Sequence, residues 1–278
     1  MWTAAALLER PEAVRRVHEE HLAAGADVVI TDTYQAALPT LAAAGLDPAA
    51  ASGLVRRAVR AAREARDAVR PGALVAGSVG PYGAHLADGS EYTGAYALDQ
   101  AGYRDFHRGR IALLLEAGVD LLAVETLPRA DEARAVAALL AEEFPRARAW
   151  FSATLAAPGT AGSDDPTEGD PAKDVPADNA ARVPDDTVRL PDGTPLREFA
   201  AELGAARAAA AVGVNCVAPD RVAGALRALR EGTSAPLVVY PNSGESYDAG
   251  TKAWSGWPAA GSPDGAPISL AGWAREWA

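Results

Sequence analysis

The sequence predicts an α/β fold of the (β/α) barrel type, in which parallel strands alternate with helices. Three observations support this prediction. Helical patterns and short apolar strand patterns alternate about every 30 to 45 residues, as parallel β/α architecture requires. Several of the apolar runs stop at polar residues, as barrel strands do at their functional end. The length of 278 residues suits one such barrel or two small domains.

The chain opens with a predicted helix over residues 13–24 and a short buried strand over residues 28–30. The helix has apolar residues at helical spacing, and the strand consists of three β-branched residues followed by polar ones. His18 and His21 lie three residues apart on this helix and could in principle chelate a metal. We expect a solvated helix face instead, because no third ligand lies nearby in the sequence.

A second helix is predicted over residues 48–69, with apolar residues along one side and arginines along the other. The strand over residues 74–79 follows and runs into the glycine-rich segment 80–83. This segment lacks the lysine and the spacing of a phosphate-binding loop, and it suits a loop that covers a substrate. The later patterns predict helices over residues 98–117, 129–143, 196–210 and 220–231, and strands over residues 121–124, 149–155, 212–215 and 237–240.

Residues 158–186 interrupt this rhythm. The segment is rich in proline, aspartate and glycine, and its eight acidic and two basic residues contribute −6 of the net charge of −11. It has too little apolar surface to offset the entropy of ordering, so we expect a disordered acidic insertion in a single barrel domain spanning residues 1–278. A linker between two domains is the alternative, although neither half could close a sheet alone.

The bulk properties exclude several classes of partner. The acidic balance argues against nucleic acid and anionic membranes. The single cysteine, Cys216, excludes an intramolecular disulfide, and the chain has neither a signal peptide nor a long apolar span. We therefore expect a cytoplasmic protein that binds small molecules, and formation of an oligomer is left open.

Cys216 ends the apolar run 211–215, directly before a predicted helix. This is the place where a barrel strand carries functional residues. A free cysteine is also a common buried residue without a chemical role. Cys216 alone fits both interpretations, and the neighbouring motifs favour the functional one.

Four motifs occur in one order along the chain. They are GSVGPYGAHLADGSEYTG at residues 77–94, VET at 124–126, GVNC at 213–216 and YPNSGE at 240–245. Together they resemble the homocysteine S-methyltransferase family, which consists of zinc-dependent thiol methyltransferases with a (β/α)8 TIM-type barrel. The resemblance spans nearly the whole chain. It implies methionine biosynthesis, in which homocysteine receives a methyl group from S-methylmethionine or S-adenosylmethionine.

In that family three cysteines hold a zinc ion that binds the substrate sulfur and keeps it as a thiolate. One is in the GVNC motif, and an adjacent pair lies in a GGCC motif near the C-terminus. Cys216 matches the first, and the sequence contains no counterpart of the pair. The Asp-Gly-Gly motif at the end of the family's first strand is absent too. The resemblance therefore implies an incomplete barrel, truncated at both ends, with an incomplete zinc site. A catalytically silent homologue or gene fragment is the alternative.

The resemblance also implies substrate-binding residues. Glu125 is expected to accept the ammonium group of the substrate, and a helix-capping or salt-bridge carboxylate is the alternative. Thr126, Asn215 and Asn242 are expected near the substrate or the metal, although either asparagine could simply occupy a turn. His85 could supply a zinc ligand, but one histidine cannot replace two cysteines.

Three tyrosines complete the expected site. Tyr82, Tyr92 and Tyr240 could line the pocket for the sulfonium donor, because a cation is stabilised against aromatic faces. A plain packing role is the alternative for each. The sequence identifies no residue as a certain catalytic group, and it does not distinguish between the two donors.

Overall fold

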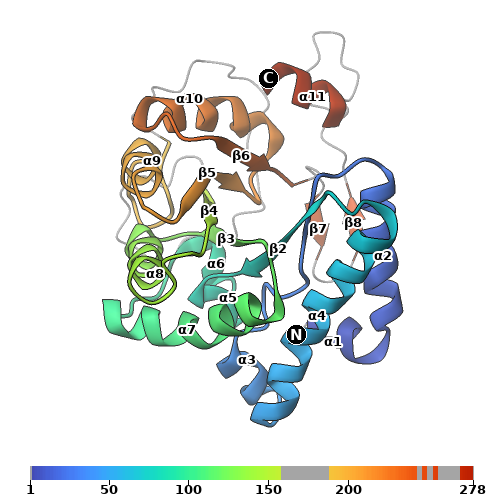
Figure 1. The fold of residues 1–278 in the computed structure, drawn as a ribbon. Helices are drawn as coiled ribbons and strands as arrows, with labels where there is room; N and C mark the ends of the chain where they lie inside the picture. The colour runs from blue at the N-terminus through green and yellow to red at the C-terminus, as the bar shows by residue number, and fades with distance from the viewer. Residues whose placement is uncertain (1, 158–187, 243–245, 249–252, 256–269, 278) are drawn as a thin grey trace.

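The computed structural model describes residues 2–157, 188–242, 246–248, 253–255 and 270–277. Six parallel strands form one sheet, in the order in which they occur in the sequence. The sheet curls into a half-barrel, and helices lie around its outer side (Figure 1). The strands are β1 (Val28–Ile30), β2 (Leu74–Val79), β3 (Leu121–Leu127), β4 (Ala149–Ala153), β5 (Ala209–Asn215) and β6 (Leu237–Tyr240).

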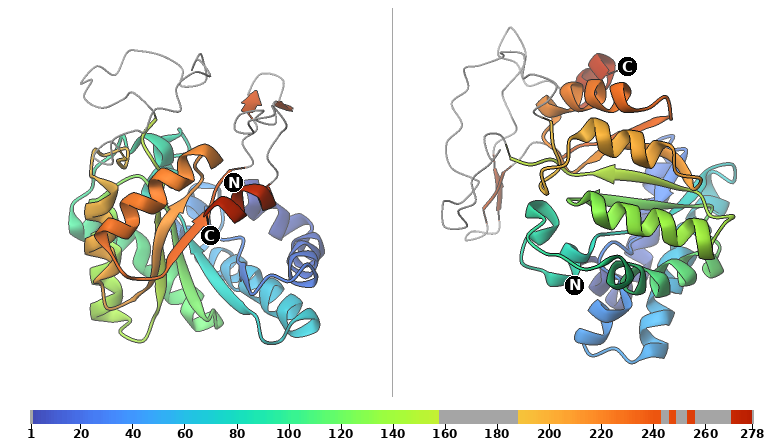
Figure 2. Two further views of the ribbon diagram at one scale, coloured as in Figure 1. Left: turned by 90° about the horizontal axis from the view of Figure 1, so that it is seen from above. Right: turned by 90° about the vertical axis from the view of Figure 1, so that its left-hand side faces the viewer.

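The helices pack against the sheet in sequence order. Figure 2 shows α2 and α4 against one part of the sheet and α8, α9 and α10 against the other. The remaining strands, β7 (Ser246–Asp248) and β8 (Ala253–Ser255), form an antiparallel pair. The helices are α1 (Trp2–Glu9), α2 (Pro11–Ala23), α3 (Leu38–Ala43), α4 (Pro48–Val69), α5 (Tyr82–Leu86), α6 (Ser90–Thr93), α7 (Gln100–Ala117), α8 (Ala130–Glu143), α9 (Leu196–Gly204), η2 (Pro219–Arg221), α10 (Val222–Gly232) and α11 (Leu270–Trp277).

This architecture confirms the predicted fold class. Each of the six strands pairs in parallel with its neighbour in the sequence, as in an incomplete TIM-type barrel. All six strands were expected from the sequence at close to their observed positions. The predicted acidic insertion falls outside the described residues, and the assignment of residues 1–278 to one domain stays a prediction. In the described ranges, no helix combines the length and the apolar character needed to cross a membrane.

Helix α4 illustrates how local sequence sets an element. The Asp47 carboxylate accepts hydrogen bonds from the backbone N–H groups of Ala49 (2.9 Å) and Ala50 (2.8 Å). Pro48 occupies the first turn, where its missing N–H costs nothing. One side of the helix is apolar and buried, and this side includes Leu54, Val55, Ala58, Val59 and Ala62.

Alternation along the strands divides the sheet into two faces. On the outer face, Leu122, Val124 and Phe151 pack into the core under the helices. The inner face carries a smaller cluster built on Ala76, Ala123 and Trp150. Polar residues two positions further along the strands share this inner face, and they are Ser78, Glu125, Ser152, Asn215 and Tyr240. The period of two therefore brings one polar side chain from each of five strands to the same end of the half-barrel.

Some local predictions are wrong. The helix predicted over 196–210 ends at Gly204, and β5 begins at Ala209, because pairing with β4 overrides the helix propensity of the alanine-rich segment. The glycine-rich segment 80–83 is not a plain loop, since α5 begins at Tyr82 within it. His18 is only 7% exposed and does not lie on a solvated face, whereas His21 is exposed. Helices α1 and α3 were not predicted.

The first testable prediction concerns Gly213 on the inner face of β5. A Cβ there would lie 1.7 Å from the backbone oxygen of Val238 on β6. We expect Gly213→Ala to lower the free energy of unfolding by about 1–3 kcal/mol or more, because the two strands must separate to make room. Urea denaturation followed by circular dichroism measures this change.

Gly53→Ala is the matched control, because a Cβ at this position in α4 has no neighbour within 4 Å. This variant should raise the stability by about 0.5–1 kcal/mol through helix propensity. A Gly213→Ala protein as stable as the Gly53→Ala protein would contradict the close approach of β5 and β6.

Candidate active site

The inner-face polar residues form a continuous hydrogen-bond network at the carboxyl ends of the strands. Its centre is Glu125 at the end of β3. The Ser78 hydroxyl on β2 donates to Glu125 Oε1 in a short hydrogen bond, and the Tyr240 hydroxyl on β6 donates to Oε2 at 2.8 Å. Trp150 Nε1 donates to the Tyr240 oxygen at 2.9 Å. Ser152 on β4 lies 2.8 Å from the same oxygen. Four strands thus position one carboxylate.

Glu125 is buried, with 7% of its surface exposed. Burial raises the pKa of this carboxyl group above the usual value, while the hydrogen bonds from Ser78 and Tyr240 and the charge of Arg110 oppose the rise. A carboxylate has about four lone-pair positions, and two hydroxyl donors leave some of them free. Glu125 can therefore still accept a hydrogen bond from a cationic group of a ligand.

A reciprocal pair of hydrogen bonds joins the ends of β3 and β5. The backbone N–H of Thr126 donates to Asn215 Oδ1 at 2.8 Å, and Asn215 Nδ2 donates to Thr126 Oγ1 at 2.7 Å. Ser152 on the intervening strand β4 also donates to Asn215 Oδ1, at 2.7 Å. Thr126 and Asn215 are both almost fully buried. Asn215 therefore acts as a cross-link over β4 and is not a turn asparagine.

Two residues of the site have left-handed backbone conformations. Thr126 has a φ of 61° and Cys216 a φ of 52°. Such conformations are costly for a residue with a Cβ, above all for β-branched threonine. They persist where the surroundings determine them, and here the hydrogen bonds to Asn215 do so. The sheet also shows a register shift between β3 and β4 over residues 124–127.

Cys216 lies directly beside this cross-link. Asn215 Nδ2 lies 3.3 Å from the sulfur, and Thr126 Oγ1 donates to it at 3.8 Å. Burial raises the pKa of the thiol, and the Glu125 and Glu91 carboxylates raise it further, while the two hydrogen bonds lower it. The thiol is only partly exposed. The described surroundings therefore favour the protonated thiol over the thiolate.

A buried arginine holds the loops that surround the site. Arg110 on α7 is 1% exposed and donates to the backbone oxygens of Tyr34 (2.8 Å) and Gly80 (2.6 Å). These oxygens belong to the loops after β1 and β2. Burial lowers the pKa of Arg110 to about 10, which leaves the guanidinium charged near neutral pH. Arg110 therefore joins two loops at the functional end of the half-barrel.

Glu132 on α8 holds the next part of the same region. Its Oε1 accepts from the backbone N–H of Tyr82 (2.7 Å) and lies 2.8 Å from His107 Nε2. Its Oε2 accepts from the Tyr96 hydroxyl at 2.6 Å. The other nitrogen of His107 lies 3.1 Å from Arg110. Sequence analysis missed this network, and its only signal was the presence of charged residues at helix positions that face the sheet.

The structure brings most of the expected residues together. Glu125, Thr126, Asn215 and Cys216 lie in one hydrogen-bonded group. Asn242 lies apart, with an exposed side chain, and its backbone N–H donates to the oxygen of Val217 at 2.9 Å. The substrate-binding roles of these residues remain predictions.

The three tyrosines and His85 differ in their surroundings. Tyr240 belongs to the Glu125 network, and Tyr92 is 52% exposed near Cys216. Tyr82 packs its ring edge-on against His85 and Phe106. His85 is further tied to Thr40 by a 3.0 Å hydrogen bond. Packing therefore accounts for the positions of Tyr82 and His85.

The described residues do not form a zinc site by themselves. Catalytic zinc usually has three protein ligands, and Cys216 is the only cysteine of the chain. Across the described ranges, no group of three His, Cys, Asp or Glu side chains could hold a metal ion. Thr126 and Asn215, the contacts of the sulfur, are weak metal ligands. A metal at Cys216 would need ligands from outside these ranges.

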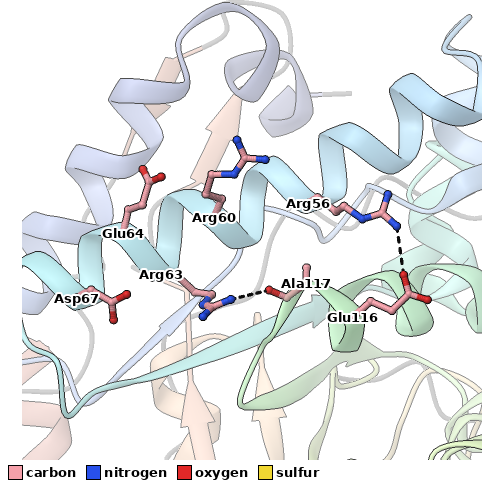
Figure 3. Close-up of a pocket in the computed structure, with 7 residues that line it drawn as sticks. All are labelled: Arg56, Arg60, Arg63, Glu64, Asp67, Glu116 and Ala117. Carbon is pink, nitrogen blue, oxygen red and sulfur yellow. Dashed lines mark hydrogen bonds and ion pairs between the residues drawn. The ribbon is translucent and has the colours of Figure 1, made fainter.

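A separate hollow lies on the outer surface, away from the strand ends. Figure 3 shows it between α4 and the end of α7, and its volume is about 340 Å³. Arg56 pairs with Glu116 at 3.2 Å, and Arg63 donates to the backbone oxygen of Ala117 at 3.0 Å. Exposed groups of both signs line the hollow, and its ion pairs contribute little to stability. We therefore place the candidate active site at the strand ends.

Comparison with known proteins gives a consistent result. The sequence model of a family described as "Homocysteine S-methyltransferase" matches residues 1–276. A protein of Escherichia coli (strain K12) named "Homocysteine S-methyltransferase" is 45% identical over 260 residues, which cover 91% of this chain and 74% of that protein. The Bacillus subtilis (strain 168) protein "Homocysteine S-methyltransferase YbgG" is 40% identical over 265 residues, or 92% of this chain and 75% of that protein.

A solved structure matches the fold as well. It is the crystal structure of the homocysteine methyltransferase MmuM from Escherichia coli in its metallated form, and it superposes with a TM-score of 0.73. The match has 43% sequence identity and covers 87% of this chain and 76% of that chain. Sequence and structure therefore point to the same group of proteins.

The second prediction tests the cross-link between β3 and β5. Asn215→Leu keeps the approximate size of the side chain but leaves the Thr126 N–H and the Ser152 hydroxyl buried without their acceptor. We expect the free energy of unfolding to fall by about 3 kcal/mol, since each buried unsatisfied group costs about 1–3 kcal/mol. Chemical denaturation measures the loss.

The same chemical change at an exposed asparagine provides the control. Asn242→Leu should alter the stability by no more than about 0.5 kcal/mol, because no buried group depends on its side chain. Equal losses in the two variants would show that Asn215 is not a cross-link.

Proposed function

The chain belongs to the homocysteine S-methyltransferase family, and on that basis we propose that it transfers a methyl group from a sulfonium donor to the thiol of homocysteine. The observation that supports this proposal most directly is the group formed by Glu125, Thr126, Asn215 and Cys216 at the strand ends. It places a buried carboxylate and a thiol together at the strand ends. Homocysteine carries an ammonium group, which a buried carboxylate can accept.

Glu125 is the proposed partner of the substrate ammonium group. It is buried, and two hydroxyl groups orient it. An ammonium group donates up to three hydrogen bonds, and a charge-assisted hydrogen bond in a buried place is stronger than one in water. Thr126 and Asn215 fix the end of β3, and so they hold Glu125 in position. Asn242, at the exposed end of β6, is proposed as an additional polar contact for the substrate.

The transfer itself is a displacement at a methyl carbon. A lone pair of the homocysteine thiolate forms a bond to the methyl carbon of the donor, while the bond from that carbon to the sulfonium sulfur breaks. The electron pair of the broken bond stays on the donor sulfur, which becomes a neutral thioether. The thiol proton passes to solvent, and one product is methionine. S-methylmethionine and S-adenosylmethionine both carry the required sulfonium group.

Zinc enters the proposal only through Cys216. We propose this thiol as one ligand of a zinc ion, because soft sulfur is a preferred ligand for zinc, and the other ligands come from outside the described residues. Bound zinc supplies stabilisation of a substrate thiolate. Since the described residues do not complete such a site, the roles of Glu125, Thr126 and Asn215 are derived without it. A catalytically silent homologue is the second candidate, which the single zinc-type ligand favours.

The third prediction tests Glu125. Glu125→Gln should lower kcat/KM for homocysteine by about 100-fold, because it removes the charge that pairs with a buried ammonium group. For the unchanged protein, kcat/KM should fall as the pH drops through the pKa of Glu125, which burial raises above its usual value of 4.5. The variant should lack this acidic limb.

Steady-state formation of methionine at saturating donor is the measurement. The control is Glu64→Gln on the exposed side of α4, which should leave both kcat/KM and its pH profile unchanged. An unchanged acidic limb in Glu125→Gln would assign that titration to another group and exclude the proposed role.

The fourth prediction concerns metal. Zinc content is measured on protein purified without chelator and dialysed with and without homocysteine. The proposed function predicts about one zinc per chain, and Cys216→Ser should lose both the zinc and the methyl transfer because the alcohol is a far weaker zinc ligand. Absence of zinc together with absence of methyl transfer in the unchanged chain would establish the catalytically silent homologue instead.

A further inference from the structure

Two buried polar atoms near Cys216 have no hydrogen-bond partner in the described part of the chain. They are the hydroxyl oxygen of Tyr34 and the Oε2 atom of Glu91. Thr126 lies close enough to Tyr34 to affect its pKa, but no hydrogen bond of normal geometry forms between them. Buried polar groups in folded proteins are nearly always paired. Two orphaned atoms beside one thiol therefore mark a place for a ligand.

Both side chains belong to the loops around the functional end of the sheet. Tyr34 follows β1, and its ring lies so close to Gly80 that a Cβ there would be 2.7 Å from it. Glu91 is on α6, and its backbone nitrogen would be 2.5 Å from a Cβ at Gly83. The glycine-rich segment after β2 thus packs against both residues. Arg110 donates hydrogen bonds to the backbone oxygens of both Tyr34 and Gly80 and so holds the two loops together.

A local turn between Asp88 and Ser90 fixes the start of the short helix that carries Glu91. Asp88 accepts hydrogen bonds from the backbone N–H of Ser90 (2.9 Å) and from its hydroxyl group. Gly89 and Gly94, at the two ends of α6, have φ values of 88° and 66°, which glycine adopts without strain. The short helix α6, which carries Glu91, therefore has a defined start and end.

Most of the charged groups around these atoms are acidic. Burial raises the pKa of Tyr34 well above its usual value and that of Tyr92 to about 12, and the Cys216 thiol and the Glu91 carboxylate add to both shifts. Glu125 and Glu91 are the charged groups that raise the pKa of Cys216. Among the described groups, Arg110 is a basic side chain that acts on Tyr34, and it also faces the carboxylates of Glu125 and Glu132. The region suits a cation, and an aromatic ring is a second favourable contact for one.

We propose that Glu91 and Tyr34, with the ring of Tyr92, form the subsite for the sulfonium methyl donor near the Cys216 thiol. The inference rests on the proposed function for the identity of the cation. Glu91 is assigned to the donor because its Oε2 is unpartnered, while Glu125 is assigned to the ammonium group of homocysteine. The two carboxylates thereby serve the two substrates.

The experiment compares two ligands that differ by one methyl cation. Isothermal titration calorimetry on the full chain measures binding of S-methylmethionine and of methionine, its neutral thioether counterpart. The unchanged protein should bind S-methylmethionine about tenfold more tightly. Glu91→Gln should reduce this preference to within about twofold, and Glu64→Gln on the outer surface should keep it. Tyr34→Phe should weaken S-methylmethionine binding and leave the fold intact, as thermal unfolding checks.

Methyl-transfer assays on the same samples separate this inference from the proposed function. Transfer by the unchanged protein with an undiminished preference in Glu91→Gln overturns the subsite and leaves the function standing. The unchanged protein could prefer the sulfonium, lose that preference in Glu91→Gln, and still transfer no methyl group to homocysteine. That result supports the subsite and overturns the proposed methyl transfer. Equal affinities for the two ligands in the unchanged protein overturn the subsite.

Discussion

The candidate site depends on the reciprocal hydrogen bonds between Asn215 and Thr126. They join two strands that are not neighbours in the sheet and hold two residues, Thr126 and Cys216, in left-handed conformations. Each such conformation costs about 1–3 kcal/mol. The cost is met by buried hydrogen bonds that have no competing partner in water. The direction of the Cys216 sulfur and the position of Glu125 both follow from this cross-link, because each is covalently next to one of its partners.

A second set of contacts holds the loops above the strands. Arg110 fastens the loops after β1 and β2 through backbone oxygens, and Glu132 fastens the segment around Tyr82 and Tyr96. Burying these charged groups costs desolvation energy, and the cost is offset because each group makes several hydrogen bonds, although Arg110 Nε has no partner among the described residues. Hydrogen bonds between the strand ends therefore fix one side of the site, and side chains of α7 and α8 fix the loops around it. Such support is what keeps polar groups in a binding site correctly oriented.

Sequence patterns were sufficient for the sheet and for part of the site. Short apolar runs predicted all six parallel strands, and the family resemblance pointed to Glu125, Thr126, Asn215 and Cys216, which lie together in the structure. Ser78 and Ser152 were not predicted, although a serine within an apolar strand was a usable signal. Arg110 and Glu132 could not have been found from periodicity, because most of their partners are more than twenty residues away in the sequence. Helix propensity misplaced the start of β5, since strand pairing overrode it.

The surroundings of Cys216 disfavour a negative charge on its sulfur. Burial and the carboxylates of Glu125 and Glu91 all act against a negative charge on sulfur at Cys216. A substrate thiol placed in the same pocket meets the same opposition, since its thiolate would be a further anion in an acidic, poorly hydrated place. Arg110 offsets part of this negative charge from within the protein, and the ligands can supply further positive charge. The ammonium group of one substrate and the sulfonium of the other can each offset one carboxylate, so that the thiolate becomes easier to form once both are bound. On this reasoning the acidity of the pocket is an advantage, because it favours assembly of both substrates before the thiol loses its proton.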